Sequence, residues 1–221
     1  LFVYGREGYT KSNSAYPARQ TYQASQTIMR NHRLDASCTV YAKQSKIAIN
    51  AGAFHNDVVC VGAMNTLFYH ECAFENSGKL QSDIRKAANG IFEPIFIEVK
   101  ESVIPLQDAI ESYLFNSMLV KIPDRKYLTL IAPLEVKKNA RVARFCENLV
   151  VGNNTIDDVY YVDVRQSMRN GGGPACLRLA VPLDSEEKKL VNNKNVLTEN
   201  LYSDLKVWIN KHYREEISPN D

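Results

Sequence analysis

The chain has 221 residues, of which 45% are hydrophobic and 24% are charged, and its formal net charge is +2. This length suits one large domain or two small ones, and the near-neutral charge indicates neither a basic nucleic-acid-binding surface nor an acidic tail. No apolar run approaches the roughly 18–20 residues that a membrane-spanning helix needs. We therefore expect a globular protein that binds neither nucleic acid nor membranes.

The N-terminal stretch LFVYGREGYT predicts a strand, because it opens on an apolar run. It has no initiator Met, no basic n-region and no small-residue cleavage site, so it is not a signal peptide. We expect the chain to come from the middle of a longer protein.

Helical and strand-like segments then alternate along the chain. Helices are indicated by good helix formers with Pro at their start or Gly at their end, and strands by short apolar runs beside turn residues. The expected helices are 16–33, 78–90, 105–116, 134–150 and 198–214. The expected strands are two within 54–74 around a turn at Gly62–Asn65, one at 94–99, two within 118–133 around the turn PDRK, and one at 159–164.

The order strand, strand, helix, strand occurs twice, at a spacing of about sixty residues. Such a spacing indicates two structural modules that pack against one another. No low-complexity linker separates them. The pattern predicts an α/β fold without an internal domain boundary.

The cysteines are Cys38, Cys60, Cys72, Cys146 and Cys176. Their odd number, irregular spacing and lack of a CxxC motif argue against a disulfide framework or a structural zinc site. They favour a reducing compartment, which we take to be the cytoplasm. Four of them lie in apolar runs, where a cysteine is usually a small buried hydrophobic residue. Only Cys176 follows a glycine loop.

The segment RQSMRNGGGPACLRLAV, residues 165–181, places three glycines and Pro174 directly before Cys176. Glycines permit positive φ angles and close approach of the main chain to a ligand, and such a loop can present a nucleophile beside backbone N–H groups. The alternative is a tight turn before a buried cysteine. A phosphate-binding loop is disfavoured, because its Lys-Ser/Thr pair is missing and a strand is expected to follow.

A cysteine nucleophile needs a base, and the histidines are His32, His55, His70 and His212. His32 and His212 lie at polar helix ends and are expected to face solvent, and we take His70 to be structural. His55 precedes Asp57 by two residues, and along a strand such residues share a face. The pair is either a polar functional cluster or an edge-strand turn with a solvated aspartate.

Arg19, in the motif YPARQ, lies at the start of the segment 16–33. Its guanidinium can bind a ligand carboxylate through two parallel hydrogen bonds. Taken alone, the residue is more typical of a protein surface than of a binding site.

Several of these segments together resemble the N-succinylarginine dihydrolase family. The motifs LFVYGRE, YPARQT, FHNDV, LFYHE, YLFNS and RQSMRNGGGPACLRL follow the family's order from residue 1 to about residue 214. The resemblance implies a guanidine-modifying enzyme whose α/β fold is part of a five-fold pseudosymmetric α/β-propeller (pentein) built of strand–strand–helix–strand modules. Residues 1–221 would be a single fragment, the C-terminal part of that domain.

The resemblance also implies roles for particular residues. Cys176 matches the family's nucleophile and His55 its catalytic histidine. Asp57 and Asn170 match substrate-contacting positions, and Arg19 matches the arginine that holds the succinyl end. The implied reaction of arginine catabolism converts N2-succinyl-L-arginine to N2-succinyl-L-ornithine, two ammonia and carbon dioxide through a covalent cysteine–amidino intermediate. No cofactor and no metal are implied.

The chain departs from the family pattern in one respect. The family's third catalytic residue is a glutamate in a Gly-Asp-Glu-Gly-type motif that lies upstream of LFVYGRE, so this glutamate is not part of the sequence. The family also continues past the last expected helix. Because the orientation of several groups supplies much of an enzyme's rate, we expect the chain alone to have little or no turnover.

Three other interpretations remain. An arginine-deiminase-like enzyme would release one ammonia, although a succinyl-binding Arg19 favours the dihydrolase. A non-catalytic fragment that acts as a binding module is supported by the missing glutamate, whereas Cys176, His55 and Asp57 speak for catalysis in the parent protein. A cysteine peptidase is disfavoured, because its local signatures are missing. The expected partner is a small-molecule substrate, and a homodimer is left open.

Overall fold

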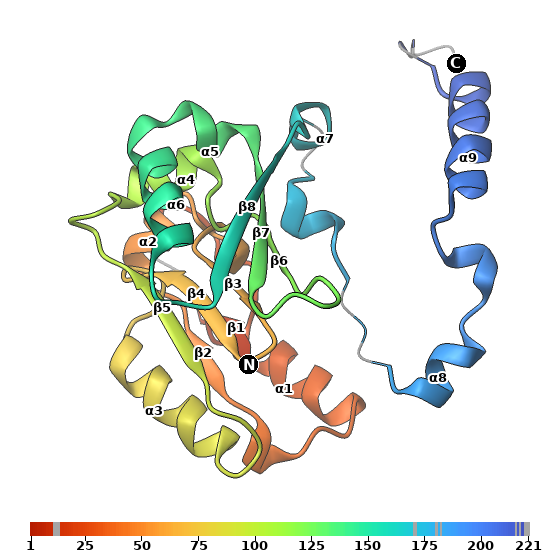
Figure 1. The fold of residues 1–221 in the computed structure, drawn as a ribbon. Coiled ribbons are helices and arrows are strands. Elements are labelled where there is room, and N and C mark those ends of the chain that lie inside the picture. Colours follow the sequence, from red (N-terminus) through yellow and green to blue (C-terminus); the bar gives the residue numbers. More distant parts are fainter. Residues whose placement is uncertain are drawn as a thin grey trace. The chain divides into compact units, whose positions relative to one another are not determined.

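The computed structural model describes residues 1–10, 14–169, 172–179, 181, 183–214, 216 and 218. The chain divides into two compact units, Leu1–Arg178 and Leu179–Asp221. All strands of the described residues belong to the first unit (Figure 1). Among all the described residues of both units, no helix has the length and apolar character needed to cross a membrane.

The helices and strands of the described residues follow one another closely along both units. The strands are β1 (Phe2–Tyr4), β2 (Tyr41–Lys43), β3 (Cys60–Ala63), β4 (Thr66–His70), β5 (Ile95–Val99), β6 (Met118–Val120), β7 (Leu128–Pro133) and β8 (Ile156–Val162). The α-helices are α1 (Tyr22–Asn31), α2 (Lys46–Asn50), α3 (Ser77–Ala88), α4 (Leu106–Ser112), α5 (Leu134–Lys138), α6 (Ala140–Val151), α7 (Arg165–Arg169), α8 (Ser185–Leu190) and α9 (Glu199–His212). The 3-10 helices are η1 (Ala36–Cys38), η2 (Asn56–Val58), η3 (Pro174–Leu177) and η4 (Asn193–Asn195).

Two three-stranded sheets have the same topology, so the predicted repeat is confirmed. In the first module (β3, β4, α3, β5), β4 pairs antiparallel with β3 and parallel with β5. In the second module (β6, β7, α5, α6, β8), β7 pairs antiparallel with β6 and parallel with β8. A two-residue turn, 64–65, joins β3 to β4, and a longer loop, 121–127, joins β6 to β7. In each module a helical segment crosses back to complete the parallel pair, as parallel pairing requires.

The middle strands of the two modules occupy matching positions. Phe68 of β4 pairs with Val61 and with Ile97. Leu130 of β7 pairs in the same way with Leu119 and Val159. Phe68 and Leu130 are both fully buried, because a middle strand covered on both faces has no side exposed to water.

The segment before the first module forms a shorter version of the same arrangement. β1 and β2 pair in parallel and are joined by α1, as β4 and β5 are joined by α3. A bridge between Gln44 and Phe74 connects this two-stranded sheet to the first module. Gln44 is buried, and its Nε2 donates to the Ala53 carbonyl.

One hydrophobic core contains side chains from both modules. Phe68 belongs to this core, with its ring 4.8 Å from that of Phe115 and 6.3 Å from that of Phe145. The core also contains buried residues of β7, α6 and β8, among them Leu130, Cys146 and Ile156. Figure 1 shows α4, α5 and α6 gathered beside these strands. The larger of the two hydrophobic clusters in the described residues is therefore formed jointly by both modules.

The helices are generally as predicted, with two corrections. The first begins at Tyr22 and not near Pro17, because the Thr21 side chain accepts a hydrogen bond from the Ala24 N–H and caps the helix there. The segment 134–150 is two helices, because Asn139 has extended backbone angles and its side chain accepts from the N–H groups of Arg141 and Val142.

The second unit, residues 179–221, contains α8, η4 and α9. The Asp184 and Glu187 side chains form a reciprocal capping box at the start of α8. Thr198 caps α9 by accepting from the Leu201 N–H. The helix predicted at 198–214 is therefore confirmed.

Candidate active site

Cys176 lies in the 3-10 helix η3 and not at the start of a strand, so the predicted strand is wrong. Its backbone N–H donates to the Gly173 carbonyl at 3.0 Å. Pro174 and Ala175 are buried, whereas the Cys176 side chain is exposed. The 3-10 turn is therefore held in place by the buried residues Pro174 and Ala175, and the thiol of Cys176 remains accessible.

The glycine loop meets the second module directly. A Cβ atom on Gly173 would lie 1.9 Å from the Oδ1 atom of Asn116, which is far inside any van der Waals distance. The φ angle of Gly173 is −79°, which any residue can adopt. Glycine is therefore required at position 173 by close approach of the Asn116 side chain and not by a positive φ.

His55 and Asp57 meet through a helix cap. His55 is the N-cap of η2, and its Nδ1 lies 3.3 Å from the Asp57 N–H. The same Nδ1 also lies in contact with the Oδ1 atom of Asp57, and this contact is an ion pair only when the imidazole is protonated. The predicted strand at this point is wrong, because residues 56–58 form a single 3-10 turn. The predicted neighbourhood of imidazole and carboxylate is nevertheless present.

The Asp57 carboxylate also contacts the thiol. The Sγ atom of Cys176 lies 3.7 Å from the Oδ2 atom of Asp57, although the two residues are 119 positions apart in sequence. One carboxylate oxygen therefore contacts the imidazole of His55 and the other contacts the thiol. Thiol, carboxylate and imidazole form one continuous chain of polar contacts.

Arg19 is brought beside this chain through its backbone. Its N–H donates to the Phe54 carbonyl at 3.2 Å, and Phe54 directly precedes His55. The ring of Tyr16 stacks on that of Phe54 with the centroids 6.3 Å apart. The Arg19 side chain is exposed. The remaining predicted site residue, Asn170, lies outside the described residues.

A cavity of about 560 Å³ lies beside the site. Asn56, Asp57 and Arg178 contribute polar groups to it, and the rest of its lining includes apolar residues of β3, α3 and β5. A guanidinium Nη1 of Arg178 donates to the Gly62 carbonyl at 3.4 Å. Asp57 therefore contacts the thiol of Cys176 and also lines the cavity.

Sequence reasoning missed three residues of this region, Asn56, Asn116 and Arg178. Asn116 lies in the motif YLFNS between a helix and a strand, and that motif was noted only as part of the family resemblance. Arg178 follows Cys176 by two residues. Nothing in their spacing shows that they would lie against the loop of Cys176.

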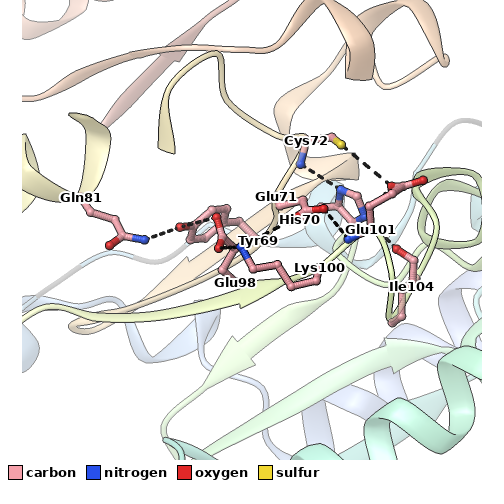
Figure 2. A network of polar contacts seen from close by, with 9 residues as sticks. All are labelled: Tyr69, His70, Glu71, Cys72, Gln81, Glu98, Lys100, Glu101 and Ile104. Carbon is pink, nitrogen blue, oxygen red and sulfur yellow. Dashed lines mark hydrogen bonds and ion pairs between the residues drawn. The ribbon is translucent and has the colours of Figure 1, made fainter. Parts of the chain in front are cut away.

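The other histidines have no contact with this site in the described part of the chain. His32 and His212 are exposed, as predicted. His70 is fully buried (Figure 2), where its Nδ1 accepts from the Cys72 N–H at 3.1 Å and its Nε2 lies 2.9 Å from the Ile104 carbonyl. An imidazole protonated on Nε2 satisfies both bonds. His70 thereby holds two loops together, which agrees with a structural role.

His70, Cys72 and Glu101 have the ligand types and spacing of a metal site, with their ligand atoms within 4.8 Å of one another. However, both ring nitrogens of His70 are already bonded to the backbone, and Glu101 accepts from the Leu106 N–H at 2.9 Å. A metal would have to displace these bonds. The cluster is therefore best explained by the loop contacts in Figure 2.

Three of the other cysteines are less exposed than Cys176. Cys60 and Cys146 are buried as predicted, and burial raises the pKa of each thiol to about 12. Cys72 is partly buried, and burial likewise raises its pKa. Cys38 is exposed, so its predicted burial is wrong. All five thiols are free, and Cys176 is the one that lies 3.7 Å from Asp57.

Comparisons with known proteins agree with the motifs. The family model for succinylarginine dihydrolase matches residues 1–221. N-succinylarginine dihydrolase 2 of Caulobacter vibrioides is 48% identical over 221 residues, covering 100% of this chain and 49% of the relative. N-succinylarginine dihydrolase of Shewanella loihica is 44% identical over 225 residues, covering 100% of this chain and 50% of the relative. The chain thus spans about half the length of these relatives and corresponds to their C-terminal half.

Proposed function

Because the chain belongs to the succinylarginine dihydrolase family, we propose that it supplies the nucleophile half of an active site that hydrolyses N2-succinyl-L-arginine. The products are N2-succinyl-L-ornithine, two ammonia and carbon dioxide. The observation that carries this proposal is the contact between the Cys176 thiol and Asp57, whose other oxygen contacts His55.

Asp57 is suited to bind the guanidinium of the substrate. Carboxylates pair with guanidinium groups through parallel hydrogen bonds, and Asp57 is partly buried, which strengthens such a pair. A guanidinium held by Asp57 would place its central carbon close to the sulfur of Cys176. Its positive charge would also favour the thiolate over the thiol, because opposite charges nearby stabilise an ionised group.

The first half of the reaction breaks one carbon–nitrogen bond. The thiolate of Cys176 attacks the guanidinium carbon and forms a carbon–sulfur bond. A terminal nitrogen then leaves as ammonia after receiving a proton from His55. Since Nδ1 of His55 contacts Asp57, Nε2 is the ring nitrogen that would transfer this proton. The result is an amidino group bound to the cysteine.

The second half returns the enzyme to its starting state. His55 takes a proton from a water molecule, the water oxygen attacks the amidino carbon, and the carbon–sulfur bond breaks to release the thiolate. A further round of the same chemistry removes the second terminal nitrogen as ammonia and leaves a carbamate on the side-chain nitrogen. The carbamate takes up a proton on this nitrogen, its carbon–nitrogen bond breaks, and N2-succinyl-L-ornithine and carbon dioxide are released. Each step that removes ammonia uses the sulfur of Cys176 and the imidazole of His55.

Arg19 and Asn170 would hold the rest of the substrate. Arg19 is attached by its backbone beside Phe54 and its side chain is exposed, so it is free to reach a succinyl carboxylate. Family resemblance assigns Asn170 to substrate contact. The catalytic glutamate and the other substrate contacts would come from the half of the relatives that this chain does not cover, so we propose that the chain alone is inactive.

The test is the number of ammonia molecules released per ornithine product. We would compare the 221-residue chain with a chimera in which it replaces the corresponding half of the Caulobacter vibrioides relative. Cys176→Ala in the same chimera is the control. Two ammonia from the chimera, with none from the chain or the control, is the expected result.

Two other outcomes would change the assignment. One ammonia with a citrulline-type product would indicate an arginine-deiminase-like enzyme. No ammonia from a folded chimera whose Cys176 thiol is intact would contradict the enzymatic proposal and leave a binding module.

A further inference from the structure

Asn116 is a buried polar residue that lies against the glycine loop. The residue is 4% exposed, and its Oδ1 atom has no hydrogen-bond partner among the described residues. Burying an unpaired carbonyl oxygen is unfavourable. An aliphatic side chain would fill the same space without this cost, so the carboxamide calls for an explanation other than core packing.

The backbone that carries Asn116 is firmly held. It lies between α4, whose C-cap Tyr113 has a φ of 57°, and β6. The preceding residue, Phe115, is fully buried, and its ring packs 4.8 Å from that of Phe68 and 6.3 Å from that of His70. Asn116 is therefore a fixed support and not a mobile side chain.

This fixed side chain lies against the backbone of the nucleophile loop. A Cβ atom on Gly173 would lie 1.9 Å from Oδ1 and 2.9 Å from Cγ of Asn116. The carboxamide thus occupies the space that any side chain at position 173 would need. The neighbouring residue is also held, because the Gly172 N–H donates to the Ser167 carbonyl at 2.9 Å.

The position of Gly173 determines the position of the thiol. Its carbonyl accepts from the Cys176 N–H at 3.0 Å, and only Pro174 and Ala175 separate the two residues. Pro174 has a restricted φ, and both residues are buried. A shift of Gly173 would therefore move Cys176 relative to Asp57.

We propose that Asn116 is a positioning residue for Cys176, acting through the backbone of Gly173. The carboxamide of Asn116 sets where the loop rests on the second module, and so keeps the sulfur of Cys176 beside Asp57. The inference rests on the proposed function, in which that sulfur attacks a guanidinium bound to Asp57. Asn116 itself takes no part in proton transfer.

The test measures the geometry of the thiol without turnover. Cys176 in the full 221-residue chain is alkylated by 2-chloroacetamidine, which is cationic, and by 2-chloroacetamide, its neutral counterpart. Peptide mass spectrometry gives the rate at Cys176 alone, and the ratio of the two rates reports how close Asp57 lies to the sulfur. Resistance of the buried thiols Cys60 and Cys146 to alkylation shows that each variant is folded.

In Asn116→Ala we expect the ratio to fall roughly tenfold, since displacements of about 1 Å have effects of this size or larger. Ser117→Ala is the matched control, because Ser117 is also buried and its hydroxyl has no hydrogen-bond partner among the described residues. Unlike Asn116, Ser117 is not among the residues nearest to a Cβ atom on Gly173. Its ratio should stay within about twofold of the original. If the original chain prefers the amidine, equal ratios in all three proteins would overturn the proposal.

A double variant tests the route through Gly173. Gly173→Ala should lower the ratio because its Cβ overlaps Asn116, and Asn116→Ala removes the overlapping atoms. The double variant should therefore be no worse than Asn116→Ala alone, which is a non-additive result. Additive losses would overturn the proposed route.

A failure of the proposed function would be recognised separately. If the original chain showed no preference for the amidine, the binding of guanidinium by Asp57 would be refuted. The rate with neutral 2-chloroacetamide would then test Asn116. An unchanged rate at Cys176 in both Asn116→Ala and Gly173→Ala would overturn the positioning role.

Discussion

The sheets of the two modules have the same topology, but the segments that precede their first strands differ. The segment before β3 carries His55 and Asp57, whereas the segment before β6 carries Asn116. The loop of Cys176 contacts both, through its thiol at Asp57 and through Gly173 at Asn116. The comparison shows how one repeated scaffold can serve two purposes, with one lead-in segment supplying reactive groups and the other supplying support.

The first test of the comparison asks whether the two modules unfold together or separately. Phe68 and Leu130 hold matching positions in β4 and β7, and both belong to the shared core. We expect Phe68→Ala to lower the free energy of unfolding by about 3–5 kcal/mol and Leu130→Ala by about 2–5 kcal/mol. Urea unfolding followed by circular dichroism should show one transition in each case. Two transitions, with only one shifted, would mean that the modules fold independently.

The difference between the lead-in segments is sharpest at Asp57. Asp57→Asn keeps the size of the side chain but removes the charge that would attract a cation. We expect the preference of Cys176 for 2-chloroacetamidine over 2-chloroacetamide to fall by roughly a hundredfold, as expected for a partly buried charge pair. Asp163→Asn is the control, because Asp163 is an exposed partner of Arg165. A preference that survives in Asp57→Asn would assign guanidinium binding to another residue.

Each module also contains a buried thiol, Cys60 in the first and Cys146 in the second. Burial raises the pKa of both from an ordinary 9.0 to about 12. Because the folded state favours the protonated thiols, their contribution to stability is complete below about pH 9 and is lost as the pH rises towards 12. At about pH 10.5 each of the two thiols should lower the free energy of unfolding by about 2 kcal/mol relative to its value below pH 9.

Thermal unfolding between pH 8 and 11 tests this expectation. Cys60→Ala and Cys146→Ala should each flatten the loss of stability with rising pH. A slope that is the same in both variants and in the original chain would show that other groups cause the alkaline sensitivity.

The smallest expected effect compares the helices of the two modules. Asn76 caps α3 by accepting from one N–H, whereas Asn139 caps α6 by accepting from two. Each substitution to Ala should lower the free energy of unfolding by about 1 kcal/mol, with the larger loss for Asn139. Urea denaturation resolves such differences if the slope is unchanged. A larger loss for Asn76→Ala would contradict this ranking.

The repeat could be predicted because it depends on local patterns. Apolar runs, a two-residue turn before Thr66 and the helix formers of 78–90 are visible in sequence, and the structure has β3, β4, α3 and β5 there. Asn139 is the local exception, since a capping asparagine inside an apparently continuous helix was not recognised.

The site could be predicted less well, because its geometry depends on distant contacts. His55 and Asp57 were expected to meet along a strand, and they meet through a capped 3-10 turn. Cys176 was expected to start a strand, and it lies in η3. The reason for a glycine at 173 is the side chain of Asn116, 57 positions earlier in the numbering, and no local pattern reveals such a contact.

The pairing of the strands has a consequence for how the chain folds. β3 and β4 are joined by a short turn and can pair rapidly, within about 1–10 μs for a hairpin. β5 can pair with β4 only after the connection that contains α3 has crossed back along the sheet. In the same way, β8 can pair with β7 only after the connection that contains α5 and α6 has crossed back. Since each parallel pairing must first close a long loop, folding should show a fast hairpin phase and a slower phase in which β5 and β8 dock. The loop of Cys176, which contacts both modules, can take its place only after that slower phase.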